Sequence, residues 1–156
     1  ISRKALSNIA AIYSRRSVAD SALHYAMLSL EADQAANDTA GYPFGYNYIG
    51  LAYQDLQLYE KSIDYFKKGL GYNPTPLTQA NLYYNIGVSF NNNTDIDSSQ
   101  NYLGIAVAKF SELAHVAGLI QCYNVMGTNM VEQGNLEQAK DYDNAFSDIK
   151  KIIEGI

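Results

Sequence analysis

The chain has 156 residues, 47% of them apolar and 17% charged, and this length suits one domain with a substantial core. The composition excludes intrinsic disorder, which needs low hydrophobicity and high net charge, and the net charge of −5 argues against direct nucleic-acid binding. A single cysteine excludes an intrachain disulfide and a multi-cysteine zinc site, and no apolar run approaches the roughly 20 residues needed for membrane insertion.

Four segments of the chain align without gaps when they start at Arg3, Pro43, Ala80 and Ile120. In each, an aliphatic residue precedes a small one: Ile9-Ala10, Ile49-Gly50, Ile86-Gly87 and Met126-Gly127. A large apolar residue follows three positions later: Tyr13, Tyr53, Phe90 and Met130. Another small residue comes further on: Ala22, Ser62, Ser99 and Ala139. A tyrosine then occupies one column in all four: Tyr25, Tyr65, Tyr102 and Tyr142. We therefore predict four repeats, at residues 3–42, 43–79, 80–119 and 120–156, in a single domain over 1–156.

Each segment is predicted to form two helices. The first segment lacks a turn glycine, and the second has Thr75-Pro76, a cap followed by a first-turn proline, as the start signal of the helix that follows it. The third breaks at residues 91–95 and the fourth at Gly134-Asn135, because Asn and Gly suit the left-handed end of a helix and Asn or Asp caps the next one. No strand-like alternation competes with these patterns, so the expected fold class is all-α.

These residues resemble a tetratricopeptide repeat (TPR) array over essentially the whole chain. The second segment matches the family best: Tyr46, Ile49-Gly50, Tyr53, Tyr59, Ser62, Phe66, Gly69 and Pro74. The resemblance implies a right-handed solenoid of about four helix–turn–helix repeats whose first helices line a concave face. The spacing of 37 to 40 residues exceeds the usual period of about 34. In this the chain resembles long-period arrays of bacterial signalling proteins, where the array is the sensory or partner-binding part of a transcriptional activator or sensor kinase.

The family pattern places one set of first-helix side chains on the concave face as candidates for partner binding. They are Asn47, Leu51, Gln54, Asp55, Asn81, Tyr84, Val88, Asn91, Gln121, Asn124 and Thr128. These columns are nearly neutral and rich in amides, which both donate and accept hydrogen bonds and so suit an extended peptide backbone. In the first segment they hold only Lys4 and Arg15 as cations, so a clamp for a terminal carboxylate is not expected.

Ten of the 14 tyrosines fall in packing columns. The four left for another role are Tyr42, Tyr48, Tyr72 and Tyr84.

No catalytic, metal or cofactor site is predicted. His24 and His115 lie in different segments, without a partner at the spacing that would build a metal site on one helix. Cys122 is interpreted as a small packing residue, because the sequence indicates no base beside it. Residues 93–99 begin like a calcium loop, but Ser98 and Gly104 stand where that loop needs its glycine and its bidentate glutamate. The chain is therefore not expected to be an enzyme.

The predicted function is non-catalytic binding of a protein or peptide, as the sensory or partner-binding part of a bacterial regulatory or signalling protein. The alternative is a structural scaffold that self-associates or organises an assembly. The last helix has a broad apolar stripe for a terminal cap: Leu136, Ala139, Tyr142, Phe146, Ile149 and Ile153. We therefore expect further repeats, a linker to an output domain or self-association to cover this end. Ile1 in place of a methionine indicates a processed chain or a fragment, and the compartment stays open between the cytoplasm, which is favoured, and an extracytoplasmic location.

Overall fold

The computed structural model describes residues 2–155, apart from the side chain of Glu154. In this range the chain forms eight α-helices, one 3-10 helix and no strand. The α-helices are α1 (Arg3–Arg15), α2 (Ala19–Ala35), α3 (Tyr42–Asp55), α4 (Tyr59–Leu70), α5 (Pro76–Asn92), α6 (Ile96–Glu112), α7 (Val116–Glu132) and α8 (Leu136–Glu154), and the 3-10 helix η1 is Thr39–Gly41. The prediction of an all-α fold of about four helix pairs is confirmed.

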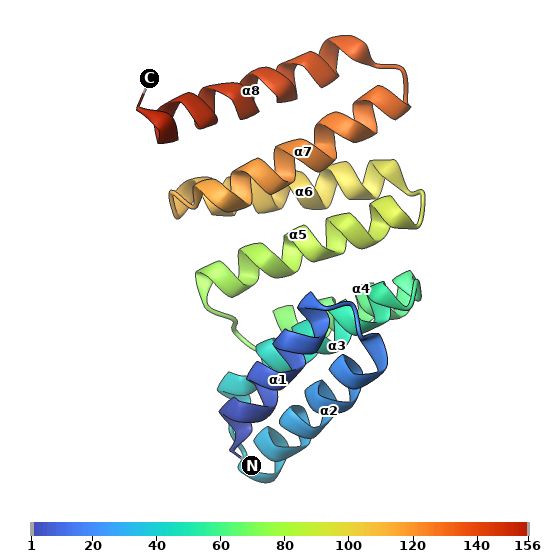
Figure 1. Cartoon of the computed structure of the whole chain (residues 1–156), viewed down its shortest axis with the longest axis vertical. Coiled ribbons are helices and arrows are strands. Elements are labelled where there is room, and N and C mark those ends of the chain that lie inside the picture. Colours follow the sequence, from blue (N-terminus) through green and yellow to red (C-terminus); the bar gives the residue numbers. More distant parts are fainter. Residues whose placement is uncertain (1, 156) are drawn as a thin grey trace.

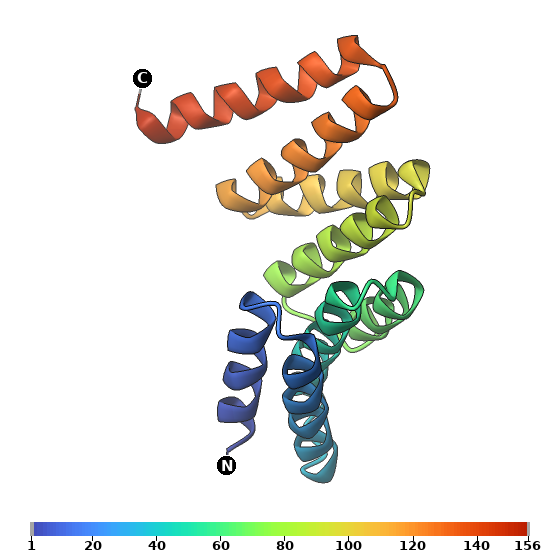
Figure 2. The ribbon, with the colours of Figure 1, turned by 45° about the vertical axis from the view of Figure 1, so that its right-hand side comes forward.

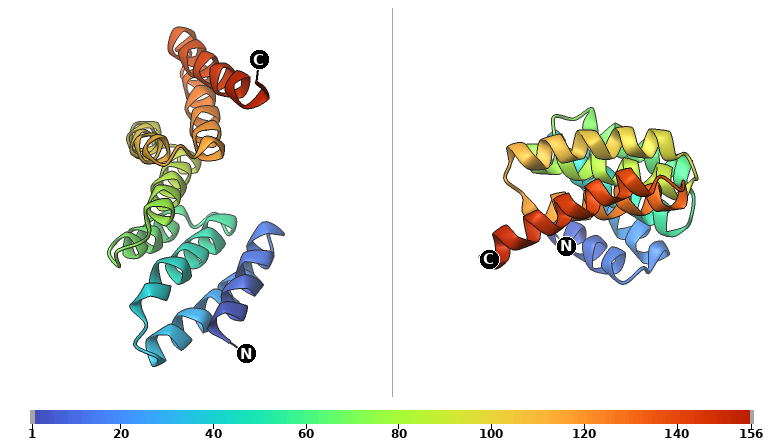
Figure 3. Two further views of the ribbon diagram at one scale, coloured as in Figure 1. Left: turned by 90° about the vertical axis from the view of Figure 1, so that its left-hand side faces the viewer. Right: turned by 90° about the horizontal axis from the view of Figure 1, so that it is seen from above.

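The helix pairs stack one on another along the long axis of the molecule (Figure 1). The pair α1 and α2 forms the N-terminal end of the stack, and the pair α7 and α8 forms the opposite end (Figures 2 and 3). Each helix packs against its neighbours in sequence, and each first helix (α1, α3, α5, α7) also contacts the first helices next to it in the stack. This nearest-neighbour packing is typical of a solenoid, and among the described residues one face of α1 and α2 and one face of α7 and α8 have no neighbouring pair.

Glycines in one column let the two helices of a pair approach closely. A Cβ atom at Gly50 would lie 2.4 Å from Cε1 of Phe66, and one at Gly87 would lie 2.7 Å from Cγ of Leu103. Both distances are too short for real side chains, so the small residue is required by the bulky one opposite, as the sequence predicts. In the first pair the columns of Gly50 and Phe66 hold Ala10 and Ala26, which are both fully buried in one cluster.

The repeated tyrosine column fills the space beside these close approaches. Its rings stack on an aromatic residue of the first helix in each pair, with centroids 5.3 to 6.2 Å apart. The stacked pairs are Tyr13 with Tyr25, Tyr53 with Tyr65, Phe90 with Tyr102, and Tyr123 with Tyr142. The tyrosine excess is therefore largely a packing feature of the repeats.

The four tyrosines that the sequence left without a packing column are also used in packing. The rings of Tyr42 and Tyr72 lie 4.9 Å apart, and both contact the ring of Tyr46. Tyr48 and Tyr84 pack against two of the buried clusters. All four rings therefore have packing contacts that the repeat columns alone did not indicate.

Every junction between consecutive α-helices contains one residue with positive φ. These residues are Ser17, Asn37, Gln57, Asn73, Thr94, Ala114 and Gly134. The third segment uses Thr94, at φ 64°, and none of the asparagines that precede it. The same backbone bond closes these turns except the one at Asn73, where Pro74 has no amide to donate; an example is the bond from the amide of Asn135 to the carbonyl of Met130 at 2.9 Å. Hydrogen bonding of the helix end, rather than glycine, thus fixes the turn. Asp95 and Asn135 cap α6 and α8 as predicted.

Candidate functional site

The predicted groove residues lie along α3, α5 and α7, the first helices that contact one another through the stack. We call this line of residues the first-helix seam. Asp55 at the end of α3 is exposed. The other members on α3 and α5 are half-buried: Asn47, Leu51, Gln54, Asn81, Tyr84, Val88 and Asn91. The members on α7 are exposed: Gln121, Asn124 and Thr128. The seam is therefore partly closed by the neighbouring helix at α3 and α5, and open at α7.

An amide network joins α3 to α5 along the seam. The side chain of Asn85 donates to Oδ1 of Asn47 at 2.9 Å. The amide of Gln54 donates to Oγ of Ser89 at 3.0 Å and reaches the Asn85 carbonyl at 3.5 Å. Ser89 also shares a hydrogen bond of 2.6 Å with the buried hydroxyl of Ser62 on α4. Asn47 and Gln54 thus spend part of their hydrogen-bonding capacity on holding two repeats together.

Sequence reasoning missed Asn85 and Ser89 as members of this network. Ser89 occupies the repeat column of Ala52 and Asn129, and all three are fully buried against the preceding pair. Ser89 and Asn129 are polar residues in one column, and they face Ser62 and Ser99 in the small column of the preceding repeat. This recurrence was the signal in the sequence for a buried polar contact between repeats.

The equivalent junction between α5, α6 and α7 is less well satisfied. Asn129 donates to Oγ of Ser99 at 3.4 Å, and Gln100 donates to the carbonyl of Met126 at 3.3 Å. The buried side-chain oxygens of Asn91, Gln100 and Asn129 have no hydrogen-bond partner among the described residues. Each such oxygen costs roughly 1 to 3 kcal/mol relative to a bonded one. The two junctions share a design but differ in how completely their polar atoms are paired.

The seam carries few charged residues, and burial raises the pKa of two of its titrating groups. Asp55 is the one charged residue among the eleven candidates, and desolvation by the surrounding protein raises the pKa of its carboxyl. Burial also raises the pKa of the Tyr84 hydroxyl, with the nearby Cys122 thiol as a second cause. The seam therefore offers hydrogen bonds and apolar contact rather than a strong field.

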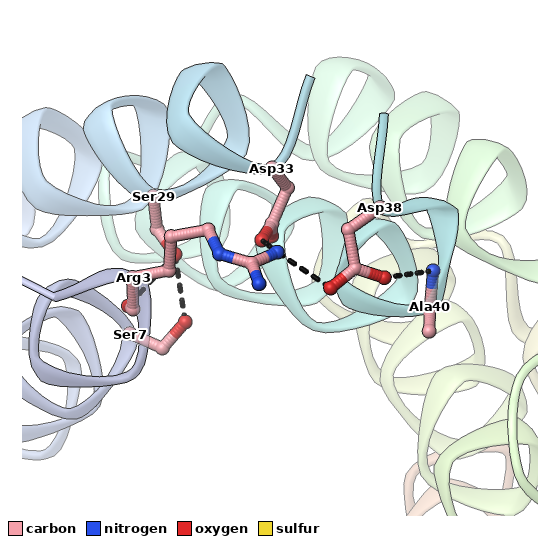
Figure 4. A network of polar contacts seen from close by, with 6 residues as sticks. All are labelled: Arg3, Ser7, Ser29, Asp33, Asp38 and Ala40. Carbon is pink, nitrogen blue, oxygen red and sulfur yellow. Dashed lines mark hydrogen bonds and ion pairs between the residues drawn. The ribbon is translucent and has the colours of Figure 1, made fainter. Parts of the chain in front are cut away.

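At the N-terminal end a cavity of about 580 Å³ lies between α1, α3 and the chain after α2. Arg3 lines it and donates to Asp33 at 2.9 Å and to Asp38, whose other oxygen accepts from the amide of Ala40 (Figure 4). This pairing lowers the pKa of Asp38 and raises that of Arg3. Because two carboxylates already hold the guanidinium, Arg3 fixes α1 to the end of α2 and is not placed as a clamp for an anionic ligand.

At the C-terminal end a second cavity, of about 410 Å³, lies between α7 and α8. Asn124 and Thr128 of the seam line it, together with the apolar side chains of Val131, Leu136 and Phe146. This is the place where the structure brings seam residues and a concave surface together.

Cys122, His115 and His24, the residues considered for catalysis, are used in packing or in capping a helix. Cys122 is fully buried, and burial raises the pKa of its thiol to about 12, so it is protonated at neutral pH. His115 lies before α7 as its helix cap, and its Nδ1 accepts a hydrogen bond of 3.1 Å from the amide of Gly118. His24 is exposed on α2 with its ring against Tyr25.

Over the described residues, no three or more His, Cys, Asp or Glu side chains are grouped to hold a metal ion. None of the helices in that part of the chain has the length and apolar character that crossing a membrane requires.

Comparison with known proteins agrees with this architecture. A comparison with curated proteins finds no match. The crystal structure of BtubC (BKLC) from P. vanneervenii is similar to this chain at a TM-score of 0.85 and 19% identity, over 99% of this chain and 65% of that one. The chain thus spans less than two thirds of that structure's length, and the likeness concerns the fold alone. Residues 45–76 match the family model described as tetratricopeptide repeat. This match and the all-α solenoid around it support a tetratricopeptide repeat assignment, and repeats of this kind generally mediate protein interactions.

Proposed function

We propose that the chain binds an extended segment of a partner protein along the first-helix seam, as the sensory or partner-binding part of a bacterial regulatory or signalling protein. The observation that carries the proposal is the seam itself, a nearly neutral, amide-rich line that runs over three helices in contact. The family supplies the general role in protein interaction, and the long repeat period supports the regulatory setting.

The hydrogen bonds of the seam indicate where contact with the partner is strongest. An extended backbone presents amide and carbonyl groups in alternation, and an Asn or Gln side chain can pair with both. Asn47 and Gln54 already bond to α5, whereas Gln121 and Asn124 on α7 are exposed. Partner binding is therefore centred on α7, with α5 as its continuation.

A panel of short uncharged peptides, measured by fluorescence anisotropy, tests the proposal. The double variant Gln121→Ala, Asn124→Ala should weaken binding at least about ten-fold, because several hydrogen bonds are lost at once. Asn101→Ala, an exposed asparagine on the second helix α6, is the matched control and should leave affinity unchanged. Affinity should also change little between low and high salt. Equal binding by the double variant and the wild type, for every peptide that binds, would exclude the α7 part of the seam.

The second candidate function is a scaffold that self-associates. It is favoured by a separate observation, the apolar surface at both ends of the stack, where Ile12 and Leu136 are exposed.

A further inference from the structure

The C-terminal cavity between α7 and α8 has the lining of a seat for a helix. Leu136 and Val131 at its edge are 68% and 56% exposed, and Tyr123 and Phe146 are half-buried in its wall. Charged side chains of α8 also line the cavity, so its wall is mixed rather than uniformly apolar, and exposed apolar side chains recur near the end of α8.

The same repeat columns elsewhere in the chain hold a helix. On α4, Ile63 and Phe66 occupy the columns of Lys140 and Asp143, and they pack on Leu82 of α5 in one buried cluster. On α6, Leu103 and Ala106 form a cluster with Cys122 and Met126 of α7. In both places the occupant is the first helix of the following pair. The pair α1 and α2 holds α3 in the same way, so the cavity between α7 and α8 is the fourth such seat, and among the described residues no helix fills it.

The first helix of the chain carries the face that fits such a seat. Ile12 occupies the repeat column of Ala52, Ser89 and Asn129, which are all fully buried against the preceding pair. Among the described residues no pair precedes α1, and Ile12 is 51% exposed, with Ile9 and Ala5 half-buried beside it. The two ends of the stack are therefore the two halves of one repeat-to-repeat contact.

The charges of α1 and of α8 are of opposite sign, although Arg3 is already paired with Asp33 and Asp38 within its own end of the stack. The segment 3–16 carries Arg3, Lys4, Arg15 and Arg16 and no acidic residue. The segment 132–154 carries six acidic residues, Glu132, Glu137, Asp141, Asp143, Asp148 and Glu154, against Lys140, Lys150 and Lys151. Inside the chain, the end of a first helix lies beside the start of the preceding second helix, as the bond between Ser89 and Ser62 shows. The same register would place Arg15 and Arg16 beside Glu132 and Glu137.

We propose that α1 of a second copy of this chain docks in the cavity between α7 and α8, so that copies join head to tail and continue the solenoid. The contact is heterologous, because it joins two different surfaces and leaves one of each unused at the ends of every oligomer. The assembly therefore grows with concentration rather than stopping at a symmetric dimer. Because opposite charges flank the contact, association weakens as salt is raised. The inference does not depend on peptide binding by the seam.

Sedimentation velocity over a wide range of protein concentrations tests the proposal. Wild type should form a concentration-dependent series of oligomers. Ile12→Asp breaks the head and Leu136→Asp breaks the tail; both sites are exposed, so circular dichroism should show unchanged helix content. Each variant alone should associate at least about ten-fold more weakly, because the new carboxylate would be desolvated without a partner. Leu77→Asp, an exposed leucine at the start of α5, is the control and should behave as wild type.

Mixing the two variants separates this arrangement from every other. The Ile12→Asp chain keeps an intact tail and the Leu136→Asp chain keeps an intact head, so an equimolar mixture should form dimers and nothing larger. The proposal is overturned by a wild type that stays monomeric at every concentration, or by a mixture that stays monomeric while wild type assembles. It is equally overturned if Leu136→Asp abolishes association and Ile12→Asp does not, since that result means tail-to-tail pairing.

Discussion

The same substitution in one repeat column should have opposite effects on stability in two repeats. Gly50→Ala gains roughly 1 kcal/mol from helix propensity but places a Cβ 2.4, 2.6 and 2.9 Å from three ring atoms of Phe66. Phe66 is fully buried, so its ring has little room to move, and such overpacking costs about 1 to 3 kcal/mol or more. Gly127→Ala gains the same propensity, while its Cβ would lie 3.6 Å from Cβ of Tyr142, an ordinary contact.

We therefore expect Gly50→Ala to lower the free energy of unfolding, by up to about 2 kcal/mol, and Gly127→Ala to raise it by up to about 1 kcal/mol. Urea denaturation followed by far-ultraviolet circular dichroism, which reports helix content, measures both free energies of unfolding. A shift in the same direction for the two variants would refute the close-approach reasoning.

A second background isolates the cause. Phe66→Leu removes the ring atoms that a Cβ at position 50 would meet, so Gly50→Ala should cost less in that background. The coupling free energy of this double-mutant cycle should be about 1 kcal/mol or more. The first repeat shows the natural form of this compensation, since Ala10 there is paired with Ala26. A coupling near zero would mean that Gly50 is required for some reason other than Phe66.

Three further outcomes follow from single residues. Thr94→Gly should stabilise the chain by roughly 1 kcal/mol in urea denaturation, because a β-branched residue at φ 64° is strained, and Gly134→Ala at φ 74° should destabilise it by a similar amount. The Cys122 thiol, with its pKa raised to about 12, should react with a disulfide reagent at pH 8 only as the chain unfolds, and rapid labelling of the native protein would contradict its burial. Arg3 lowers the pKa of Asp38 in the folded chain. The stability that this ion pair adds is therefore present above the ordinary aspartate pKa of about 3.9 and is lost as pH falls through the lower folded value. Thermal melts at a series of pH values should show this loss in wild type and a smaller loss in Arg3→Gln.

The fold was predictable from the sequence because its signals are local and repeated. The Gly50 column and the Tyr65 column each report a contact within one pair, and four aligned copies make them readable, whereas the Gly134-Asn135 turn is a signal of the last repeat alone. The left-handed residue at Thr94 was not predictable, because a backbone hydrogen bond of the helix end imposes it and nothing in the side chain indicates it.

The candidate site was harder to predict, because its residues act between repeats. Sequence columns identify which side chains share a helix face, but not how far the next first helix covers that face. Asn47 and Gln54 read as open groove residues, yet the structure places them in bonds with Asn85 and Ser89. Asn124 reads the same way and is exposed, because α7 is the last first helix among the described residues.

Peptide binding on α7 and docking of a second copy use the same cavity between α7 and α8, so the two events exclude each other there. Asn124 and Thr128 line the cavity that would receive α1 of a second copy, so a peptide bound there should compete with head-to-tail association. By linkage, peptide should lower the average mass in sedimentation, and raising the protein concentration should weaken apparent peptide affinity. The Ile12→Asp chain, which keeps the cavity and both seam residues unchanged, should bind peptide without this concentration dependence. Oligomers that take up peptide with no loss of mass would mean that the partner lies elsewhere on the seam, while leaving the end-to-end contact intact.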